Sequence, residues 1–322
     1  MKKILFYLMI IAVITGPSAS AAQEKAINIS GYNAVFMPFH DRSGRIKIAV
    51  RSFTQESKEK ILAIDAETFE TEILERAALN AGDVPKVRLA KTPFMKALEK
   101  YTEVRDNDNR NGIKHGEDSA LNGVFLTIDL CPSKKALDKG LFQRTIQLAR
   151  LNKNQAYAAI AVSGLWIERH GEDLDWILNE AREKKLNIAW INHTYSHPYK
   201  KGLDDKRNFM LLPEARLTKE VFSNEVIMLQ NSIVPSPFFR FPGLISDASL
   251  LKELKTLSLI PIDAGAWPAK GGDTKMGGII LVHGNGNEPQ GIKRLFEFYD
   301  KMNREFASGG IKLLDLKDAF LK

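Results

Sequence analysis

Residues 124–129, Val-Phe-Leu-Thr-Ile-Asp, form an apolar run that ends on a carboxylate. A short run of this kind predicts a buried strand. Further strand-like runs follow at 157–162, 187–192, 237–241, 257–263, 278–283 and 311–314, and helical patterns lie between most of them, at 136–151, 174–185, 219–231, 248–256 and 292–306. This alternation indicates parallel strands with crossover helices. We therefore expect an α/β fold over residues 116–322, a β/α barrel of about seven units, with an open doubly wound sheet as the competing architecture.

Residues 23–115 have a different pattern. Two β-prone runs, 33–39 and 45–51, flank the turn sequence Asp41-Arg42-Ser43-Gly44 and predict a hairpin. Residues 68–81 and 92–104 look helical or mixed, and the polar stretch 105–112 is typical of a linker or surface loop. The sequence predicts a small α+β accessory domain ahead of the barrel.

The first 22 residues have the features of a signal peptide. Lys2 and Lys3 precede an apolar run, residues 4–14, and the small residues Ala19-Ser20-Ala21 follow. A run of 11 apolar residues is shorter than the roughly 20 that span a bilayer. We expect cleavage near Ala21 or Ala22 and an exported protein, periplasmic or secreted, with no stable membrane span.

Composition excludes several classes of protein. Hydrophobic residues make up 44% and charged residues 26% of the chain, as in globular proteins. The net charge of +7 is spread without a long basic run, which suits loose attraction to an anionic envelope polymer but not nucleic-acid binding. Cys131 is the only cysteine, so no intramolecular disulfide can form.

Chemically reactive side chains occur where the predicted strands end. These residues are Asp129, His193, His197, Arg240, Asp263, Trp267 and His283, and they include three of the chain's six histidines. In parallel β/α barrels the carboxyl ends of the strands meet at one mouth, where active sites lie. We therefore expect these residues to gather at a single site.

The residue types suggest roles, each with a structural alternative. His193 and His197 have an i, i+4 spacing, which on one helical turn would place both imidazoles on one face as metal ligands. The alternative is that both are surface or hydrogen-bonded histidines. Asp129 is a general base or a cap for the following turn. His283 is a general acid or a core histidine. Arg240 needs a carboxylate partner beside its aromatic neighbours, for which Asp263 is the candidate.

In order along the chain, five segments resemble the signature motifs of polysaccharide deacetylases, also called carbohydrate esterase family four. The segments are Thr127-Ile128-Asp129, His193-Thr194-Tyr195-Ser196-His197, Arg240-Phe241-Pro242-Gly243, Asp263 to Trp267 and Leu281-Val282-His283. The resemblance covers about residues 120–322. It implies a distorted β/α barrel, Asp129 as base, His193 and His197 on a divalent metal such as zinc, and His283 as acid. It also implies groove walls formed by Arg240, Phe241, Pro242, Asp263 and Trp267.

The activity implied by the resemblance is hydrolysis of acetyl groups, amide or ester, from an N-acetylated envelope or extracellular polysaccharide. Phe241 and Trp267 would stack on sugar faces, although aromatic residues at this spacing are also common in cores. A catalytically inactive glycan-binding protein and an amidase acting on a small amide are the alternatives. The stretch between Pro198 and Leu217 is longer than usual for a βα connection, and we expect it to overhang the site beside His197.

Two positions depart from the family pattern. Leu130 stands where the family has its third metal ligand, an aspartate, with Cys131 next, and Ala266 stands where an acidic residue is common. Since adjacent strand residues point to opposite sides, we expect Cys131 to reach the metal only if the chain has already turned at Pro132. The favoured expectation is a weak two-histidine site completed by water or Asp129, with thiolate ligation and loss of the metal as alternatives.

Overall fold

The computed structural model describes residues 27–78, 84–104 and 110–321. The predicted signal peptide and most of the predicted linker lie outside these residues. Among the helices within these ranges, none has the length and apolar character needed to cross a bilayer.

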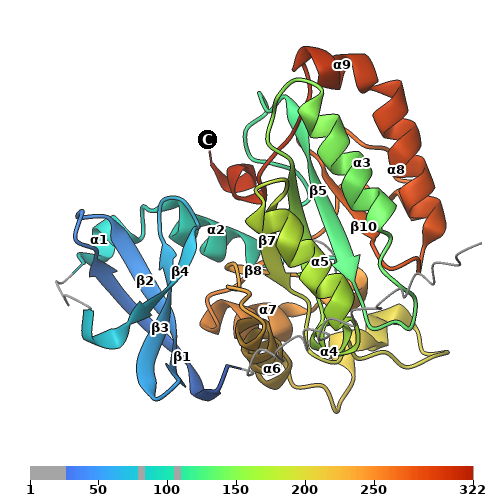
Figure 1. The fold of residues 1–322 in the computed structure, drawn as a ribbon. Coiled ribbons are helices and arrows are strands. Elements are labelled where there is room, and N and C mark those ends of the chain that lie inside the picture. The colour runs from blue at the N-terminus through green and yellow to red at the C-terminus, as the bar shows by residue number, and fades with distance from the viewer. Residues whose placement is uncertain (1–26, 79–83, 105–109, 322) are drawn as a thin grey trace, which may run out of the picture.

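The N-terminal region is built on an antiparallel sheet of order β1-β2-β3-β4 (Figure 1). Its strands are β1 (Ile29–His40), β2 (Ile46–Gln55), β3 (Lys58–Asp65) and β4 (Thr71–Glu75), followed by η1 (Arg76–Ala78), α1 (Lys86–Leu89) and α2 (Pro93–Tyr101). The predicted hairpin is confirmed as β1–β2, and the Asp41 carboxylate accepts from the backbone N–H of Ser43 in its turn. Thr92 caps α2 through its side chain.

The second sheet is parallel, in the order β10-β5-β6-β7-β8-β9, with β11 also paired to β5. Its strands are β5 (Gly123–Leu130), β6 (Tyr157–Val162), β7 (Asn187–Asn192), β8 (Phe238–Phe239), β9 (Ile260–Pro261), β10 (Ile279–His283) and β11 (Lys312–Leu313). All seven predicted strands are present. The sheet curls until Ala266, just after β9, bridges to Ile280 of β10, so the distorted barrel is confirmed over the open sheet.

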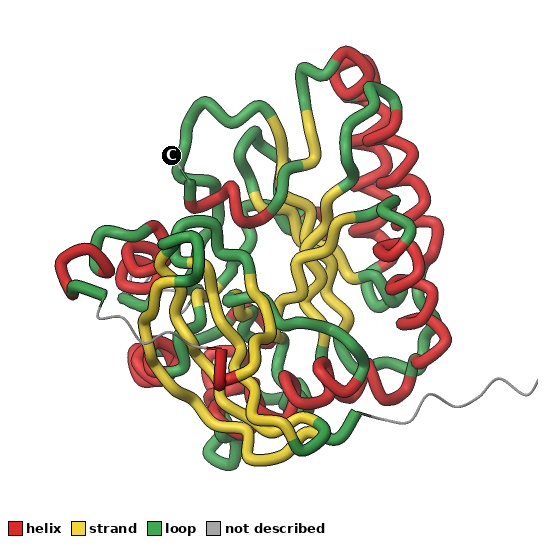
Figure 2. Tube along the Cα trace, turned by 60° about the vertical axis from the view of Figure 1, so that its left-hand side comes forward, coloured by secondary structure: helices red, strands yellow, loops and turns green. Residues whose placement is uncertain are grey.

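Helices cover the outer face of this sheet (Figures 1 and 2). They are α3 (Lys139–Arg150), α4 (Gly164–Arg169), α5 (Gly171–Arg182), α6 (Leu217–Gln230), α7 (Ala248–Thr256), α8 (Pro289–Lys301) and α9 (Asn303–Ser308). Short 3₁₀ turns occur at η2 (Asp205–Arg207), η3 (Phe209–Leu211), η4 (Pro242–Leu244), η5 (Pro268–Lys270) and η6 (Leu316–Phe320). Asp138 and Asp247 cap α3 and α7 through their carboxylates.

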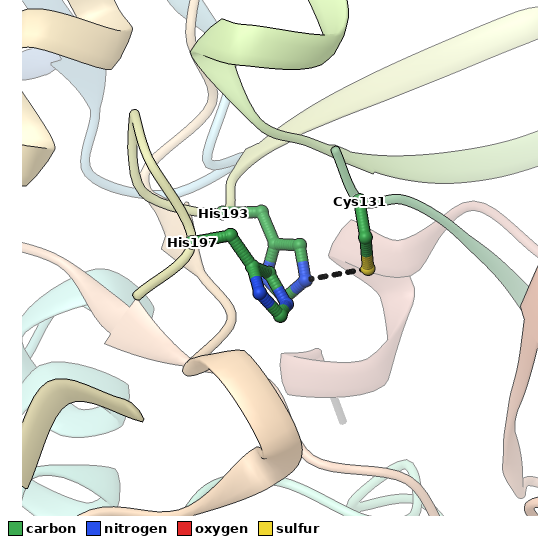
Figure 3. A group of neighbouring side chains, drawn as sticks. All are labelled: Cys131, His193 and His197. Carbon is green, nitrogen blue, oxygen red and sulfur yellow. Dashed lines mark hydrogen bonds between the residues drawn. The ribbon is translucent and has the colours of Figure 1, made fainter. Parts of the chain in front are cut away.

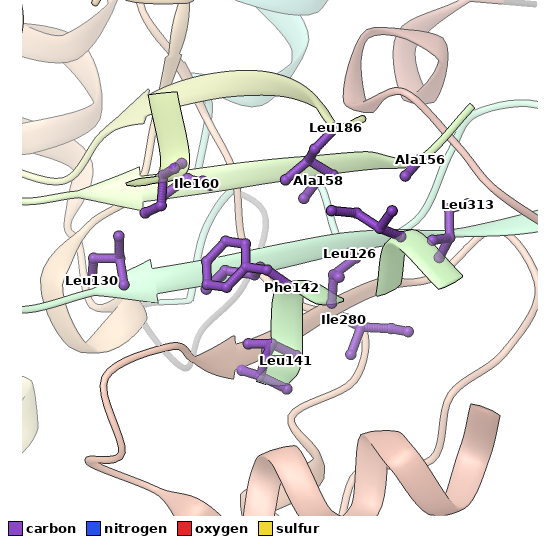
Figure 4. Packing of buried hydrophobic residues seen from close by; sticks show 14 of the residues in the cluster. Leu126, Leu130, Leu141, Phe142, Ala156, Ala158, Ile160, Leu186, Ile280 and Leu313 are labelled. Carbon is purple, nitrogen blue, oxygen red and sulfur yellow. The ribbon is translucent and has the colours of Figure 1, made fainter. Parts of the chain in front are cut away.

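Strand β5 shows how the fold separates core from site. Leu126 and Leu130 point outward and pack with Phe142 of α3 in the layer between sheet and helices (Figure 4). The alternate residues Thr127 and Asp129 point inward. Because side chains alternate along a strand, the same run supplies both the outer core and the floor of the barrel mouth.

The N-terminal sheet shares its core with the barrel. Ile48 and Phe69 belong to the same buried cluster as the barrel residues Phe125 and Phe238. The rings of Phe69 and Phe238 stack with centroids 6.1 Å apart, and Phe320 lies 5.2 Å from each of them. The two regions thus bury apolar surface against each other.

A fully buried ion pair also crosses this interface. Arg51 of β2 donates from Nε and Nη2 to the carboxylate of Glu225 on α6, at 2.7 and 3.0 Å. The hydroxyl of Tyr32 donates to the same carboxylate at 2.8 Å. Helix α6 is therefore attached to the N-terminal sheet by charge as well as by packing.

The prediction that residues 105–112 form a linker or surface loop is wrong at the C-terminal end of this stretch. Asn111 is buried and its amide contacts Ser246, while a Cβ at Gly112, where φ is +126°, would lie 2.7 Å from the carbonyl oxygen of Pro261. Residues 110–112 run against the barrel because their backbone packs beside β9. Residues 105–109 lie outside the described ranges.

Candidate active site

A cavity of about 300 Å³ opens at the carboxyl ends of the parallel strands. Its walls are formed by Asp129, Cys131, His193, His197, Asp205, Phe209, Gly243, Leu244, Trp267, Lys270, Leu281, His283 and Glu288. A second cavity of about 360 Å³ lies near the other ends of β6 and β7, against the N-terminal sheet, and contains none of the predicted site residues. The predicted convergence on one mouth is therefore seen for Asp129, His193, His197, Trp267 and His283.

Asp129, one residue before the end of β5, is held in a fully buried ion pair. Its Oδ1 lies 2.6 Å from Nη1 of Arg240, and the same Nη1 donates to the hydroxyl of Thr127 at 2.7 Å. Burial raises the pKa of Asp129, but the Arg240 guanidinium and the neighbouring imidazoles outweigh it and lower that pKa below its usual range. Asp129 is therefore an anion held in a fixed orientation.

The predicted pairing of Arg240 with the Asp263 carboxylate is wrong. Arg240 uses Nη2 to donate to the backbone carbonyl of Asp263 at 3.1 Å. The Asp263 side chain faces the other way, with Oδ1 2.6 Å from Arg110 and Oδ2 3.6 Å from Lys114. The arginine instead pairs with Asp129, because both side chains point into the barrel and Asp263 turns toward the segment beside β9.

The two histidines meet, although not on a helical turn. Their ring centroids lie 4.8 Å apart, and the chain between them is a loop in which Thr194 and His197 have φ values of 64° and 50°. The prediction of a helical turn between the two histidines is wrong, because side chains hold this segment as a loop. Asn192 accepts from the Thr194 backbone N–H, and Glu220 of α6 accepts from the backbone and hydroxyl of Ser196.

His193 has a defined orientation. Its Nδ1 lies 2.8 Å from the carbonyl oxygen of Arg240, which can only accept, so Nδ1 carries the proton. In the neutral imidazole Nε2 then has the lone pair, on the side of Cys131. A ring nitrogen bonded to a backbone carbonyl is the usual arrangement behind a metal-ligating histidine.

Cys131 lies against this pair. Its Sγ is 3.6 Å from His193 Nε2 (Figure 3), and the sulfur and one nitrogen from each of His193 and His197 all lie within 4.8 Å of one another. Burial raises the pKa of the Cys131 thiol, but His197 and the other imidazoles outweigh burial and hold it well below its usual range. The three side chains form a set of donors suited to a metal ion.

His283, in register with Asp129 on the neighbouring strand, lies beside a carboxylate that the sequence did not reveal. Its Nδ1 is 3.0 Å from Oε2 of Glu288, which also accepts from Nε1 of Trp267 at 2.7 Å. Burial lowers the pKa of His283, yet Cys131 and Glu288 more than offset this and raise it to about 11. His283 therefore holds its proton at neutral pH, as a general acid must.

The long connection after His197 borders the cavity, as expected. Asn208 organises it by bonding to both the backbone N–H and carbonyl of Lys200. Asp205 and Phe209 reach the cavity wall, and the Phe209 ring contacts that of His197. Gly243, with φ of +65°, leaves room for this ring, since a Cβ there would come within 2.3 Å of it.

Phe241 and Pro242 take no part in the cavity wall. Both are buried, and Phe241 packs with Phe239 and Leu251 in a separate core cluster. The expectation that Phe241 stacks on sugar is therefore wrong, because its side chain faces α7. Trp267 does border the cavity, with its ring centroid 6.2 Å from that of His283.

Residues 30–86 match a family model described as the RP012 protein N-terminal domain. Among solved structures, the chain is similar to the Bc1960 peptidoglycan N-acetylglucosamine deacetylase, with 18% identity over 71% of this chain and 96% of that one and a TM-score of 0.46. A family 4 carbohydrate esterase from Bacillus anthracis also has 18% identity, over 74% and 93% of the chains, with a TM-score of 0.45.

A third similar structure is a BA3943 mutant, described as a CE4 family pseudoenzyme with restored enzymatic activity. It has 15% identity to this chain over 91% of this chain and 93% of the other, with a TM-score of 0.45.

Proposed function

We propose that this chain is an exported polysaccharide deacetylase of carbohydrate esterase family four, which hydrolyses acetyl groups from an N-acetylated polysaccharide. The observation that carries the proposal is the constellation around the 300 Å³ cavity. A buried carboxylate held by arginine, a histidine pair and a protonated histidine come from separate strand ends and face one space. Hydrolysis of an amide needs a base for water, an electrophile for the carbonyl and an acid for the amine.

A divalent metal, with zinc the simplest choice, is supported by the chemistry of the donors, since imidazole and thiolate groups both suit zinc. His193 and His197 would hold it. When bound, the metal supplies Lewis acidity to the acetyl carbonyl and to water.

The protein's own residues perform the proton transfers. Asp129, kept anionic and oriented by Arg240, accepts a proton from the attacking water as its oxygen adds to the acetyl carbon. His283 then gives its proton to the nitrogen as the C–N bond breaks, which releases acetate and a free amine on the sugar. Trp267 would pack against a sugar ring beside this acid.

The test is acetate release by the purified protein from acetylated chitooligosaccharide, peptidoglycan and xylan fragments, with added zinc and after chelation. The proposal predicts release from at least one substrate and its loss with chelator. Absence of release from all three, together with glycan binding unaffected by chelator, would instead identify an inactive glycan-binding protein.

A further inference from the structure

We propose that Cys131 is the third protein ligand of the metal, as a thiolate, in place of the carboxylate that Leu130 cannot supply. The inference deepens the proposed function and rests on it only for the presence of a metal. The centre would then contain one sulfur and two imidazole nitrogens, with a fourth position open to water or substrate.

Strand geometry explains why the side chain of Cys131, and not that of the preceding Leu130, lies at the barrel mouth. Leu130 belongs to the outer core with Leu126 and Phe142. Cys131 follows the last residue of β5, and its side chain borders the cavity together with that of Asp129. The chain bends at Pro132, so the turn that we expected there is present.

The backbone around Cys131 is fixed on both sides. Its carbonyl accepts from the amide of Asn285 at 2.7 Å, and the carbonyl of Leu130 accepts from the backbone and hydroxyl of Ser163. Cys131 is itself 7% exposed. The thiol is thus held in one position relative to the histidines.

The distance between the sulfur and one imidazole fits a tetrahedral metal. Zinc bonds of about 2.3 Å to sulfur and about 2.0 to 2.1 Å to nitrogen, at a tetrahedral angle, separate the two donor atoms by about 3.6 Å. The observed distance between Cys131 Sγ and His193 Nε2 is 3.6 Å. Since His193 Nδ1 is bound to a carbonyl, Nε2, which lies next to the sulfur, is the ring nitrogen available to a metal ion.

Because the chain has a single cysteine, two measurements report on Cys131 alone. The cobalt-loaded protein should show a near-ultraviolet charge-transfer band from sulfur to cobalt. Zinc should slow alkylation of the thiol by at least about tenfold, since a ligating thiolate is no longer a free nucleophile. Removing the zinc with a chelator should restore the original rate.

Variants separate ligation from mere proximity. Cys131→Ser should lose the band and bind zinc at least about 100-fold more weakly, since even indirect partners of a metal ligand are worth 10- to 100-fold. Cys131→Asp should recover part of the affinity without the band, because a carboxylate is also a zinc ligand. Thermal melting of each apoprotein checks that it is folded.

A matched control moves the single thiol onto the surface. In Cys131→Ser combined with Lys134→Cys the thiol is exposed, so its alkylation should be fast and unaffected by zinc. Wild-type protein that binds cobalt through His193 but shows no band and no zinc protection would overturn the inference and leave the proposed function standing. Wild-type protein that binds neither cobalt nor zinc would overturn both.

Discussion

Asp129 combines two properties that a catalytic base requires, a negative charge and a fixed direction. Both come from Arg240, whose guanidinium lies 2.6 Å away in a fully buried position. A neutral side chain of the same shape retains the packing but cannot accept a proton from water.

Asp129→Asn is therefore expected to reduce kcat for acetate release by roughly 100-fold or more, the usual range for a general base. Zinc content should stay at the wild-type level, because Cys131, His193 and His197 are the residues that would hold the metal. Steady-state kinetics on the best substrate, with metal analysis of the same sample, test this. Wild-type kcat in this variant would place the base elsewhere.

Glu288 is a positioning residue for His283, which it contacts while also accepting from Trp267. Burial raises the pKa of Glu288, but His283 and Trp267 outweigh it, and the pKa falls to about 2, so the residue is anionic. The negative charge helps, together with Cys131, to keep the imidazole protonated.

Glu288→Gln should lower kcat roughly tenfold and change KM little, since the acid acts in bond breaking and not in binding. Glu288→Asp should retain more activity than Glu288→Gln because it keeps the charge. The control is Glu297→Gln on α8, which makes the same change at an exposed position outside the cavity wall and should leave kcat within about twofold. Equal losses in all three variants would indicate a general disturbance of the fold.

At the scale of elements, the connection between β7 and α6 determines what borders the cavity beside His197. Asn208 holds this connection together by bonds to Lys200 and Leu203, and Asp205 reaches the wall. Within this connection residues 201–205 are largely exposed, whereas Phe209, Met210 and Leu212 are buried.

Replacing residues 201–205 by two glycines should change the ratio of kcat/KM between acetylated substrates more than it changes the melting temperature. The physical reason is that residues 201–205 contribute Asp205 to the cavity wall, whereas the buried residues of the connection follow them at Phe209, Met210 and Leu212. Kinetics on chitooligosaccharide and xylan fragments, with a thermal melt, measure both. A large fall in melting temperature with unchanged preference would assign the segment a structural role.

For the whole molecule, the ion pair between Arg51 and Glu225 connects the N-terminal sheet to α6. The same helix holds the histidine loop, because Glu220 bonds to Ser196 and its carbonyl accepts from Tyr195. The N-terminal sheet therefore supports the site through α6, although it contributes no residue to the cavity wall.

Arg51→Ala should destabilise the protein by about 3 to 5 kcal/mol, since it leaves the Glu225 carboxylate buried without its cation. Urea unfolding measures the effect. The control Lys58→Ala removes an exposed pair with Glu75 and should change the free energy of unfolding by less than about 0.5 kcal/mol. An equally small effect of Arg51→Ala would show that packing alone joins the two regions.

The sequence by itself determined the barrel and much of the site. Apolar runs alternating with amphipathic segments predicted all seven parallel strands, since hydrophobic periodicity reflects burial locally. Asp129, His193, His197 and His283 could be found because each stands at a predicted strand end, where topology alone brings side chains together.

Tertiary structure alone decided which of these groups contact one another. Arg240 pairs with Asp129 and not with the Asp263 carboxylate, and Phe241 packs in the core. Glu288 contacts His283, although in the sequence it looks like an ordinary residue before a helix. The tertiary structure also places the N-terminal sheet against α6, and it places Cys131 beside His193 and His197. These outcomes depend on distances between segments remote in sequence and on the direction of single side chains, which local periodicity does not encode.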